Sequence, residues 1–344
     1  MRSLARARAC SFVAVSAGSL MLAAAAAAGA DDRQIGSVTD GVAFSLRAYG
    51  GSVAWLNLGA DPDYRVWQGG RVRVLSFDRS SGRLGLVDLG PAGRGGLVAI
   101  YERCQFSDES GFSGCDIYRY SFRTQRSTPV PGAVSPGAEE RSPSTWRGHD
   151  AFIRGGYPYK GKPTGVLIRS PLVRLAPLWP GVGHYGGDTG TDLRRNVITW
   201  EESGFDSDRS GIEVKRFDRR GHGRRCEVAA GGSSRSAEGT VNTGVGDPQL
   251  DGRYVYWSQR AVRARRGSPE TTTASVRRRL LPGQRCESRG RVEQALVRSG
   301  RDYWQRFAVS NGRLFYVLNH VHHSENAAIY EARDVSFRPV HGRG

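Results

Sequence analysis

Short runs of alternating apolar and polar residues recur along this chain, each followed by a turn. The clearest unit covers residues 98–121, where an apolar strand leads into a loop of Ser, Asp and Gly. The alternating segment 116–120 follows that loop. Successive side chains on a strand point to opposite faces, so this alternation indicates a strand with one buried face. The stretch is predicted to form a β-hairpin.

The same two-strand unit occurs six times with different residues. Its first strand ends in a bulky residue, and these markers are Trp55, Ile100, Ile153, Trp200, Trp257 and Tyr316. Successive markers are 45, 53, 47, 57 and 59 residues apart. A period in this range, with strands throughout, is typical of propellers and similar arrays. We expect the markers to be core residues that fill the space between neighbouring sheets.

Each repeat can supply two further strands. Turns at 147–149, 194–196, 251–253 and 310–313 contain Gly, Asn or Asp, which tolerate the positive φ of a tight hairpin. One apolar residue precedes each of these turns, and Gly69-Gly70 precedes the weaker apolar stretch 72–75. Four antiparallel strands per repeat make one propeller blade.

The predicted fold is therefore all-β, a six-bladed β-propeller forming one domain over residues 31–344. Five or seven blades also fit, because the last two spacings are long and the closing strand is open. Either residues 34–38 or residues 335–340 could complete the final blade. Segments 131–143 and 231–246 are rich in Gly, Ser, Pro or Ala and are predicted to be surface connections between blades. Outside the first thirty residues, no convincing amphipathic helix is found.

Two motifs resemble the secreted TolB-like β-propeller proteins of bacteria, particularly poorly characterised Arg-rich actinobacterial members. They are residues 90–99 and residues 114–120, whose strand Cys-Asp-Ile-Tyr-Arg-Tyr is similar to the blade pattern of that superfamily. The other repeats lack the Asp-x-x-Thr-Gly turn and keep only the hydrophobic pattern and spacing. The resemblance implies a WD40-like propeller and export more than an activity. No separate α/β domain is expected before the first repeat.

Residues 1–30 have the features of a signal peptide. Arg2, Arg6 and Arg8 give a basic start, residues 12–28 are almost all apolar, and Ala28-Gly29-Ala30 is a small-residue cleavage site. The alternative is a transmembrane anchor, which the Ala-rich run and cleavage site disfavour. A secreted or cell-envelope protein with no membrane span is expected, and a monomer.

Four cysteines remain after the leader, namely Cys104, Cys115, Cys226 and Cys286. An even number in an exported chain suggests two disulfides. The predicted hairpin favours Cys104–Cys115, whose short loop is worth roughly 3 kcal/mol by the loop-closure estimate. Cys226–Cys286 follows by elimination and requires that the two residues approach closely.

The chain is strongly basic, with 50 Lys and Arg against 33 Asp and Glu and a formal net charge of +17. Loss of the three leader arginines, with no acid lost, leaves 17 − 3 = +14. A basic surface favours anionic partners such as wall polymers, membrane head groups or nucleic acid. A genome whose base composition favours Arg over Lys codons is the alternative explanation.

Two arginine clusters are candidate binding surfaces. The predicted binding residues are Arg260, Arg263, Arg265 and Arg266, in the long loop of the fifth repeat. The others are Arg219, Arg220, Arg224 and Arg225, which crowd one turn, and Arg277, Arg278 and Arg279. Guanidinium groups bind phosphates and carboxylates with two hydrogen bonds. Few aromatics lie between them, so stacking on single-stranded nucleic acid is not expected. A merely solvated loop is the alternative.

Three short motifs match chemical sites only in part. Residues 181–186 match G-x-G-x-x-G, but no helix pattern follows for a dinucleotide phosphate. Residues 206–211 have the D-x-D-x-S-G spacing of a calcium loop, but Phe217 stands where the final Glu belongs. His320 and His322 could share one face of an extended segment beside His323, with only Glu325 near enough to assist a zinc ion. Each is more simply a polar loop, and no metal or cofactor is expected.

The predicted function is an exported, non-catalytic propeller that binds a protein segment or an anionic polymer. No G-x-S-x-G, H-E-x-x-H or free Cys–His pair indicates a nucleophile or metalloprotease. The alternative is an extracellular hydrolase or lyase acting on carbohydrate, because acids on different blades could meet at the axis. Two carboxylates in a pocket at the channel mouth would favour the enzyme. A mouth lined by Arg, Tyr and backbone would favour binding.

Overall fold

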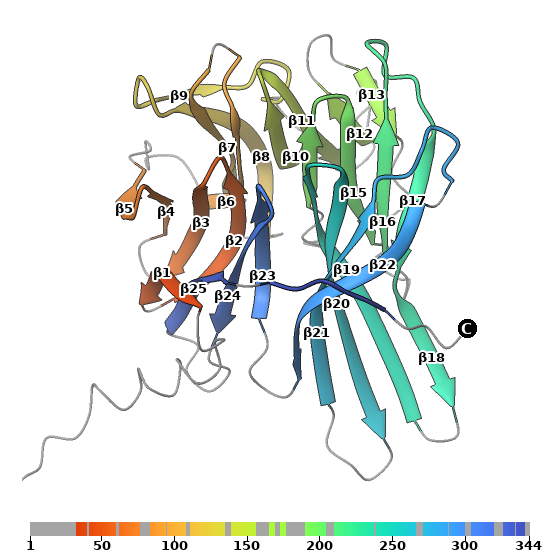
Figure 1. Ribbon diagram of the computed structural model, residues 1–344. Helices are drawn as coiled ribbons and strands as arrows, with labels where there is room; N and C mark the ends of the chain where they lie inside the picture. Colours follow the sequence, from red (N-terminus) through yellow and green to blue (C-terminus); the bar gives the residue numbers. More distant parts are fainter. Residues whose placement is uncertain are drawn as a thin grey trace, which may run out of the picture.

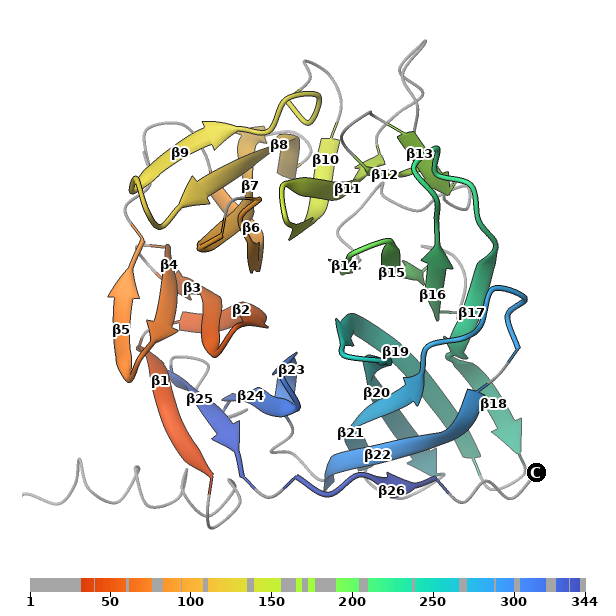
Figure 2. The same cartoon turned by 45° about the horizontal axis from the view of Figure 1, so that its top comes forward.

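The described residues of this computed structural model form six antiparallel sheets arranged in a ring around a central axis (Figures 1 and 2). The structure describes residues 32–39, 41–59, 62–75, 83–93, 95–107, 111–134, 139–155, 165–168, 173–176, 190–203, 210–236, 239–265, 271–287, 289–299, 304–319, 326–333 and 335–340. The predicted leader, residues 1–30, lies outside these ranges. The prediction of an all-β, six-bladed propeller is confirmed, and the five- and seven-bladed alternatives are wrong.

Blades are numbered in chain order, and each sheet follows the chain from the axis outwards. Blade 1 consists of β2 Gly41–Tyr49, β3 Ser52–Gly59, β4 Asp63–Gln68 and β5 Arg71–Val74. Blade 2 consists of β6 Arg83–Pro91, β7 Leu97–Ser107, β8 Gly111–Ser121 and β9 Arg126–Pro129. Blade 3 consists of β10 Glu139–Trp146, β11 His149–Gly155, β12 Gly165–Ile168 and β13 Val173–Ala176. Blade 4 consists of β14 Thr191–Arg194, β15 Val197–Ser203, β16 Ser210–Arg216 and β17 Arg225–Ala230.

Blades 5 and 6 depart from this plain order. Blade 5 has six described strands in the order β18 Gly232–Ser236, β19 Gly239–Asp251, β20 Tyr254–Arg265, β21 Thr271–Leu280, β22 Arg289–Ser299 and β26 Arg338–Pro339. Of these, β19 to β22 correspond to the first to fourth strands of the other blades. Blade 6 consists of β23 Trp304–Ser310, β24 Arg313–Asn319, β25 Asn326–Ala332 and, outermost, β1 Arg33–Thr39.

The first and second strands of five blades, all except blade 2, are joined by a two-residue turn. In blades 1, 3 and 6 both central residues have positive φ, as at Arg147 (50°) and Gly148 (86°), or Asn311 (53°) and Gly312 (74°). Such turns match the twist of the strands they join. The predicted turns are confirmed, and they place the end of every first strand on the same side of the ring as the start of its second strand.

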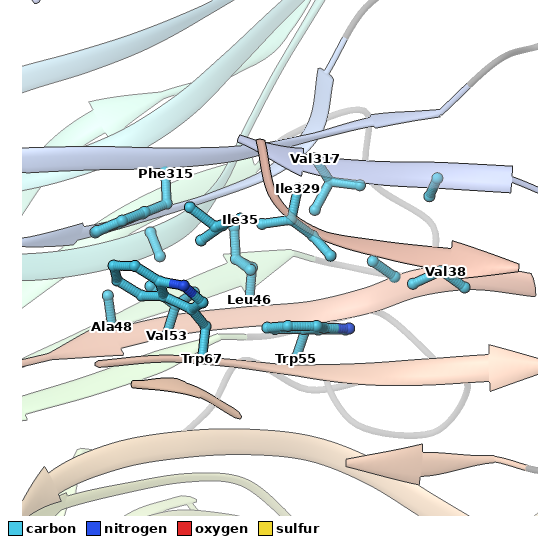
Figure 3. Close-up of a cluster of buried hydrophobic side chains, with 13 residues drawn as sticks. Ile35, Val38, Leu46, Ala48, Val53, Trp55, Trp67, Phe315, Val317 and Ile329 are labelled. Carbon is cyan, nitrogen blue, oxygen red and sulfur yellow. The ribbon is translucent and has the colours of Figure 1, made fainter. Parts of the chain in front are cut away.

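The ring closes through the N-terminal strand. β1 pairs antiparallel with β25, from Arg33 opposite Glu331 to Thr39 opposite Asn326. Of the two predicted closing segments, residues 34–38 complete the final blade, and β26 instead pairs with β22 of blade 5. Figure 3 shows the core that this closure forms, with side chains from blades 6 and 1 facing one another.

The bulky markers lie in the cores between blades, as predicted. Trp55 packs among blade 6 and blade 1 residues, Trp200 against blade 3 and Trp257 against blade 4. These three indoles are no more than 1% exposed, and each indole N–H is buried without a hydrogen-bond partner. Their contribution is therefore apolar packing between blades, in which the area buried outweighs one unpaired N–H each.

Residues 131–134 form a turn between β9 of blade 2 and β10 of blade 3, as predicted for a connection, and residues 139–143 already belong to β10. For residues 231–246 the prediction is wrong, because they contain β18 and the first half of β19. In β10 most polar side chains are buried and bonded to other strands, as Glu140 is to Arg154 at 2.8 Å and Ser144 to Thr191 of blade 4 at 3.0 Å. The start of β19 is partly exposed, so neither strand needs a regular apolar pattern. In Figure 1 the long strands of blade 5 project beyond the lower end of the ring.

Both predicted disulfides are present. Cys104–Cys115 joins β7 to β8 within blade 2, with Cα atoms 3.8 Å apart. Cys226–Cys286 joins β17 of blade 4 to the segment between β21 and β22 of blade 5, with Cα atoms 5.3 Å apart. The second bond therefore crosses from one blade to the next. Within the part of the chain that is described, no helix is long and apolar enough to cross a membrane.

Candidate functional site in the axial channel

The first strand of each blade faces the axis, so one equivalent position on each strand forms a ring inside the channel. This position is three residues before the turn in five blades. The six residues of this axial ring are Arg47, Asp88, Ser144, Asp192, Gln249 and Ala308. The ring thus contains one cation, two carboxylates, an amide, a hydroxyl and a methyl group. All six are buried.

Arg47 extends from blade 1 towards the opposite side of the ring. A Cβ atom built on Gly190, next to β14 of blade 4, would lie 2.9 Å from its guanidinium Nη2. The same Cβ position lies 3.4 Å from Cδ of Pro248 in blade 5. The glycine therefore gives the guanidinium room against the far wall. The channel is crossed by a side chain at this level.

The two ring carboxylates are bonded to the backbone of the next blade. Asp88 in blade 2 accepts a hydrogen bond from the N–H of Thr145 in blade 3, at 3.0 Å. Asp192 in blade 4 accepts one from the N–H of Leu250 in blade 5, at 2.6 Å. Each bond satisfies a buried donor that would otherwise be costly. These acids therefore connect blades.

Neutral residues of other blades make the same connection. The Ser45 hydroxyl lies 3.3 Å from both the N and the O of Val87 in the next blade. The Gln249 amide accepts from the N–H of Val309 at 3.0 Å and donates to the carbonyl of Phe307 at 2.6 Å. Side chain to backbone bonding between neighbouring blades is thus a repeated feature of the channel wall.

Burial makes the ring carboxylates poor acids. Desolvation raises the pKa of Asp88 from 3.8 to about 7, and the neighbouring charge of Asp192 adds to this. Arg47, the Thr145 N–H and Arg194 act in the opposite direction. Desolvation also raises the pKa of Asp192, against the effects of Arg194, the Leu250 N–H and Arg47. The two buried acids therefore share the positive charge of Arg47 and Arg194.

Aromatic rings and an arginine meet where the first strands end. The ring of Tyr49 meets that of Trp146 edge to face, with centroids 5.7 Å apart. The guanidinium of Arg194 lies 5.1 Å from the Tyr49 centroid and 5.2 Å from that of Trp146. These residues come from blades 1, 3 and 4, so they cover this end of the channel by cation–π contact.

A further ion pair lies nearer the starts of the first strands. Arg306 of blade 6 is 2.7 Å from Oδ1 of Asp247 in blade 5, and its guanidinium lies 5.4 Å from the ring centroid of Phe44 in blade 1. Asp247 is buried and Arg306 mostly so. Within the described residues the channel thus contains charged groups at several levels, each held by another blade.

This arrangement fits binding and stability better than hydrolysis. Acid–base catalysis needs carboxylates that reach a substrate and exchange protons with it. Asp88 and Asp192 do converge, but they are about 4–5% exposed and bonded to backbone amides. The channel end formed by Tyr49, Trp146 and Arg194 has the Arg and aromatic lining expected of a binding surface.

The prediction that the arginine patch occupies a loop is wrong for its described members, because Arg260, Arg263 and Arg265 belong to strand β20 of blade 5. Arg260 and Arg263 are exposed, and they are opposite Ala274 and Thr271 of β21. Because they are three positions apart on a regular strand, their side chains project from opposite faces. Arg265 belongs to the same strand and pairs with Gly239, and Arg266 lies outside the described residues.

The other sequence motifs fall mostly outside the described residues. These are residues 181–186, residues 206–209 of the predicted calcium loop, and the three histidines at 320, 322 and 323. The described remainder of the calcium motif, Ser210 and Gly211, begins β16. Among described residues, no group of three or more His, Cys, Asp or Glu could hold a metal ion.

Sequence reasoning missed the axial ring. The sequence did contain one signal for it. The residue three positions before the first-to-second strand turn is polar or charged in four of the blades, as Arg, Ser, Asp or Gln. Asp192 and Gln249 each precede a leucine that was recognised as a strand residue. Reading that polar residue as channel-facing would have found Asp192.

Comparison with known proteins adds little to this geometry. No protein-family model matches the chain, and no curated protein does. Three similar solved structures are a prolyl endopeptidase (12% identity, TM-score 0.41, covering 92% of this chain and 52% of that chain), TolB from Acinetobacter baumannii (11%, 0.40, 84% and 65%) and an oligogalacturonate lyase from Vibrio parahaemolyticus (7%, 0.43, 88% and 93%). The chain spans about half of the first and 65% of TolB. These similarities carry no argument about activity.

Proposed function

We propose that this protein is an exported, non-catalytic propeller scaffold that binds a protein segment or an anionic polymer outside the cytoplasm. The observation that carries the proposal is the use of the channel acids. Asp88 and Asp192 bond to the next blade, and Arg47 crosses the channel between them. Because these acids hold neighbouring blades together, the proposal assigns recognition of the partner to the outer surfaces of the propeller.

Two further features support this function. Disulfides persist in oxidising compartments, which fits export, and two are present. The strong positive charge of the chain favours an anionic partner. The predicted arginine patch on β20, with Arg265 and Arg266 at its end, is one candidate surface for this partner.

The test is to measure binding and turnover on the same samples. The chain from residue 31 would be passed over immobilised polyphosphate and polygalacturonate, and the soluble polymers would be assayed for new reducing ends and unsaturated products. We expect retention that falls steeply with salt, and no product. Absence of retention on both polymers would contradict an anionic-polymer partner.

One observation favours a second function, a carbohydrate hydrolase or lyase. Asp88 has a pKa raised to about 7 beside a second carboxylate, as in the acid–base pair of a glycosidase. Product formation that is lost in the Asp88→Asn variant, while binding is kept, would establish this function and refute the scaffold.

A further inference from the structure

Among the described residues, more exposed arginines lie on the turns at one end of the ring than on β20. This turn face consists of the turns joining first to second strands and third to fourth strands. Backbone bonds bring the two kinds together, as from the Phe217 N–H to the Asn196 carbonyl and from the Leu281 N–H to the Arg253 carbonyl. It is the upper end in Figure 1 and comes forward in Figure 2.

Contacts between blades show that the first-to-second strand turns share this face. The Gly312 N–H of blade 6 donates to Asp251 of blade 5 at 2.7 Å. The Arg147 N–H of blade 3 donates to the Pro91 carbonyl of blade 2 at 2.8 Å. A Cβ atom on Gly51 of blade 1 would lie 3.6 Å from the guanidinium of Arg313. The turns therefore form one continuous surface around the axis.

Exposed arginines occur in most of these turns. Arg147, Arg195 and Arg253 occupy the first-to-second strand turns of blades 3, 4 and 5. The third-to-fourth strand turns of blades 2, 4 and 5 carry more, all exposed: Arg123, Arg219, Arg220, Arg224 and Arg285. Charges spread over several blades suit a partner that is itself extended and repeatedly charged.

The acids on the turns are committed to backbone donors. Asp218 accepts from the N–H groups of Arg220 at 2.8 Å and His222 at 2.9 Å, and these bonds, the His222 one first, lower its pKa. Glu287 accepts from the N–H of Arg285 at 3.0 Å. The guanidinium groups of Arg220 and Arg285 take no part in these bonds. The negative charges therefore shape the loops and neutralise the face only in part.

A cleft of about 500 Å³ opens on this face between blades 4 and 5. Its polar lining includes Arg216, His222, Arg224 and the acid Asp218. Its apolar lining includes Val214 and Pro282. Arg216 donates from Nε to the Pro282 carbonyl at 3.3 Å, so the two blades meet across it. The disulfide of Cys226, which also lines the cleft, fixes its width. A volume in this range holds one small ligand or one unit of a polymer.

The hydrophobic residues argue against a protein or membrane partner on this face. The exposed large hydrophobics of the described chain are Val72, Val74, Val134 and Val297, and none lies in these turns. Protein interfaces are anchored by buried aromatics, and interfacial membrane binding needs apolar side chains that enter the lipid. Two aromatics beside this face, Tyr49 and Trp146, are partly buried and pack against each other and against Arg194. The face therefore presents arginines rather than exposed apolar anchors, which suits a polyanion.

We propose that the turn face binds a linear polyanion, with one of its phosphate or carboxylate groups seated in the cleft between blades 4 and 5. This inference rests on the proposed function, to which it adds the surface and the class of ligand. Arginine forks bind either oxyanion with two hydrogen bonds, so both polymer chemistries fit.

The experiment compares two variants with the same loss of charge. The turn-face variant is Arg219→Gln, Arg220→Gln, Arg224→Gln and Arg285→Gln. The second variant, which serves as the control, removes the competing candidate surface at β20: Arg260→Gln, Arg263→Gln, Arg265→Gln and Arg266→Gln. Binding of fluorescent polyphosphate and of polygalacturonate to the chain from residue 31 would be measured by anisotropy across a salt series. Circular dichroism melting would show that both variants fold.

We expect the turn-face variant to bind about tenfold more weakly at low salt with a shallower salt dependence, and the control to change less than about threefold. The polymer that binds more tightly identifies the oxyanion. Equal losses, or a larger loss in the control, would overturn the turn face while leaving the scaffold function intact. No binding by the unchanged protein would instead remove the polymer partner itself. Tighter binding to anionic phosphatidylglycerol vesicles than to either polymer would also overturn it.

A third variant tests the cleft without changing charge. Gln284 lines the cleft and is exposed, so Gln284→Trp would fill space without removing an arginine. We expect affinity to fall by about threefold or more, because the seated group loses its site. Unchanged affinity would overturn the role of the cleft.

Discussion

At the scale of single residues, one structural position has different chemistry in each blade. The axial ring contains charged residues in blades 1, 2 and 4 and neutral ones in the rest. A buried carboxylate without nearby positive charge would be costly, and Arg47 serves both Asp88 and Asp192. Arg194 also favours the charged form of both acids, but desolvation outweighs the two guanidinium groups. The raised pKa that results gives the protein a pH-dependent stability.

Replacing Asp88 by Asn should reduce this pH dependence. The folded-state pKa of about 7 exceeds the ordinary 3.8, so the folded chain holds a proton that the unfolded chain has released. Its stabilising effect is therefore complete below about pH 4 and is lost as the pH rises through 7. Asn keeps an acceptor for the Thr145 N–H. We expect Asp88→Asn to equal or exceed the unchanged protein in stability at about pH 8, measured by urea unfolding.

A matched control has the opposite sign. Asp218 is exposed, and hydrogen bonds lower its pKa, so its contribution is lost as the pH falls. Asp218→Asn should therefore lower stability by a constant amount at neutral and alkaline pH, and make little difference in acid, where the carboxyl group is protonated in both states. If Asp88→Asn kept the full slope of the unchanged protein between about pH 5 and 8, Asp88 would not be its source.

At the scale of elements, the closing strand β1 depends on a close approach. Gly36 lies against the indole of Trp55, and a Cβ atom there would be 2.8 Å from Cη2 and 2.9 Å from Cζ2. The indole is fully buried and has no space into which to move. A side chain at residue 36 would therefore push β1 away from the core between blades 6 and 1.

Gly36→Val should destabilise the protein by roughly 1–3 kcal/mol, the usual cost of overfilling a packed core. Urea unfolding would measure it. Gly244→Val is the matched control, because Gly244 is also in a strand, is exposed, and has nothing within 4 Å of its Cβ position. Similar effects of the two substitutions would mean that β-strand glycine itself, not the contact with Trp55, determines the loss.

At the scale of the whole molecule, the two disulfides act at different levels. Cys104–Cys115 closes 11 residues inside one blade, whereas Cys226–Cys286 spans 60 residues and two blades. Closing a longer loop removes more freedom from the unfolded chain, although only logarithmically. The second bond also fixes two blades side by side at the cleft.

Replacing both cysteines of a pair by serine should therefore cost more for the second pair. Loop closure gives about 4 kcal/mol for Cys226→Ser with Cys286→Ser, and about 3 kcal/mol for Cys104→Ser with Cys115→Ser. Equilibrium unfolding of both double variants would test the order. The reverse order would show that strain or residual structure outweighs loop length.

Much of the architecture was predictable from residues because the second and third strands of each blade face two apolar cores. Trp200 and Trp257 mark such strands through size and spacing alone. Inner strands were harder, since β10 buries bonded polar side chains and the start of β19 is partly exposed, so both look like loops in sequence. The axial acids were missed for the same reason. Arg260 and Arg263 are neighbours in sequence, yet strand alternation separates their side chains.

The pairing of β1 with β25 has a consequence for how the chain is made. Arg33 lies 298 residues from its partner Glu331. Synthesis proceeds from the N-terminus, so this first strand emerges long before the edge that receives it exists. Until then its hydrogen-bonding groups remain open to other strands, which is an aggregation hazard. Pairing of β1 with β25 is thus a late folding step. The rate of this pairing should govern how much newly made protein reaches the native state.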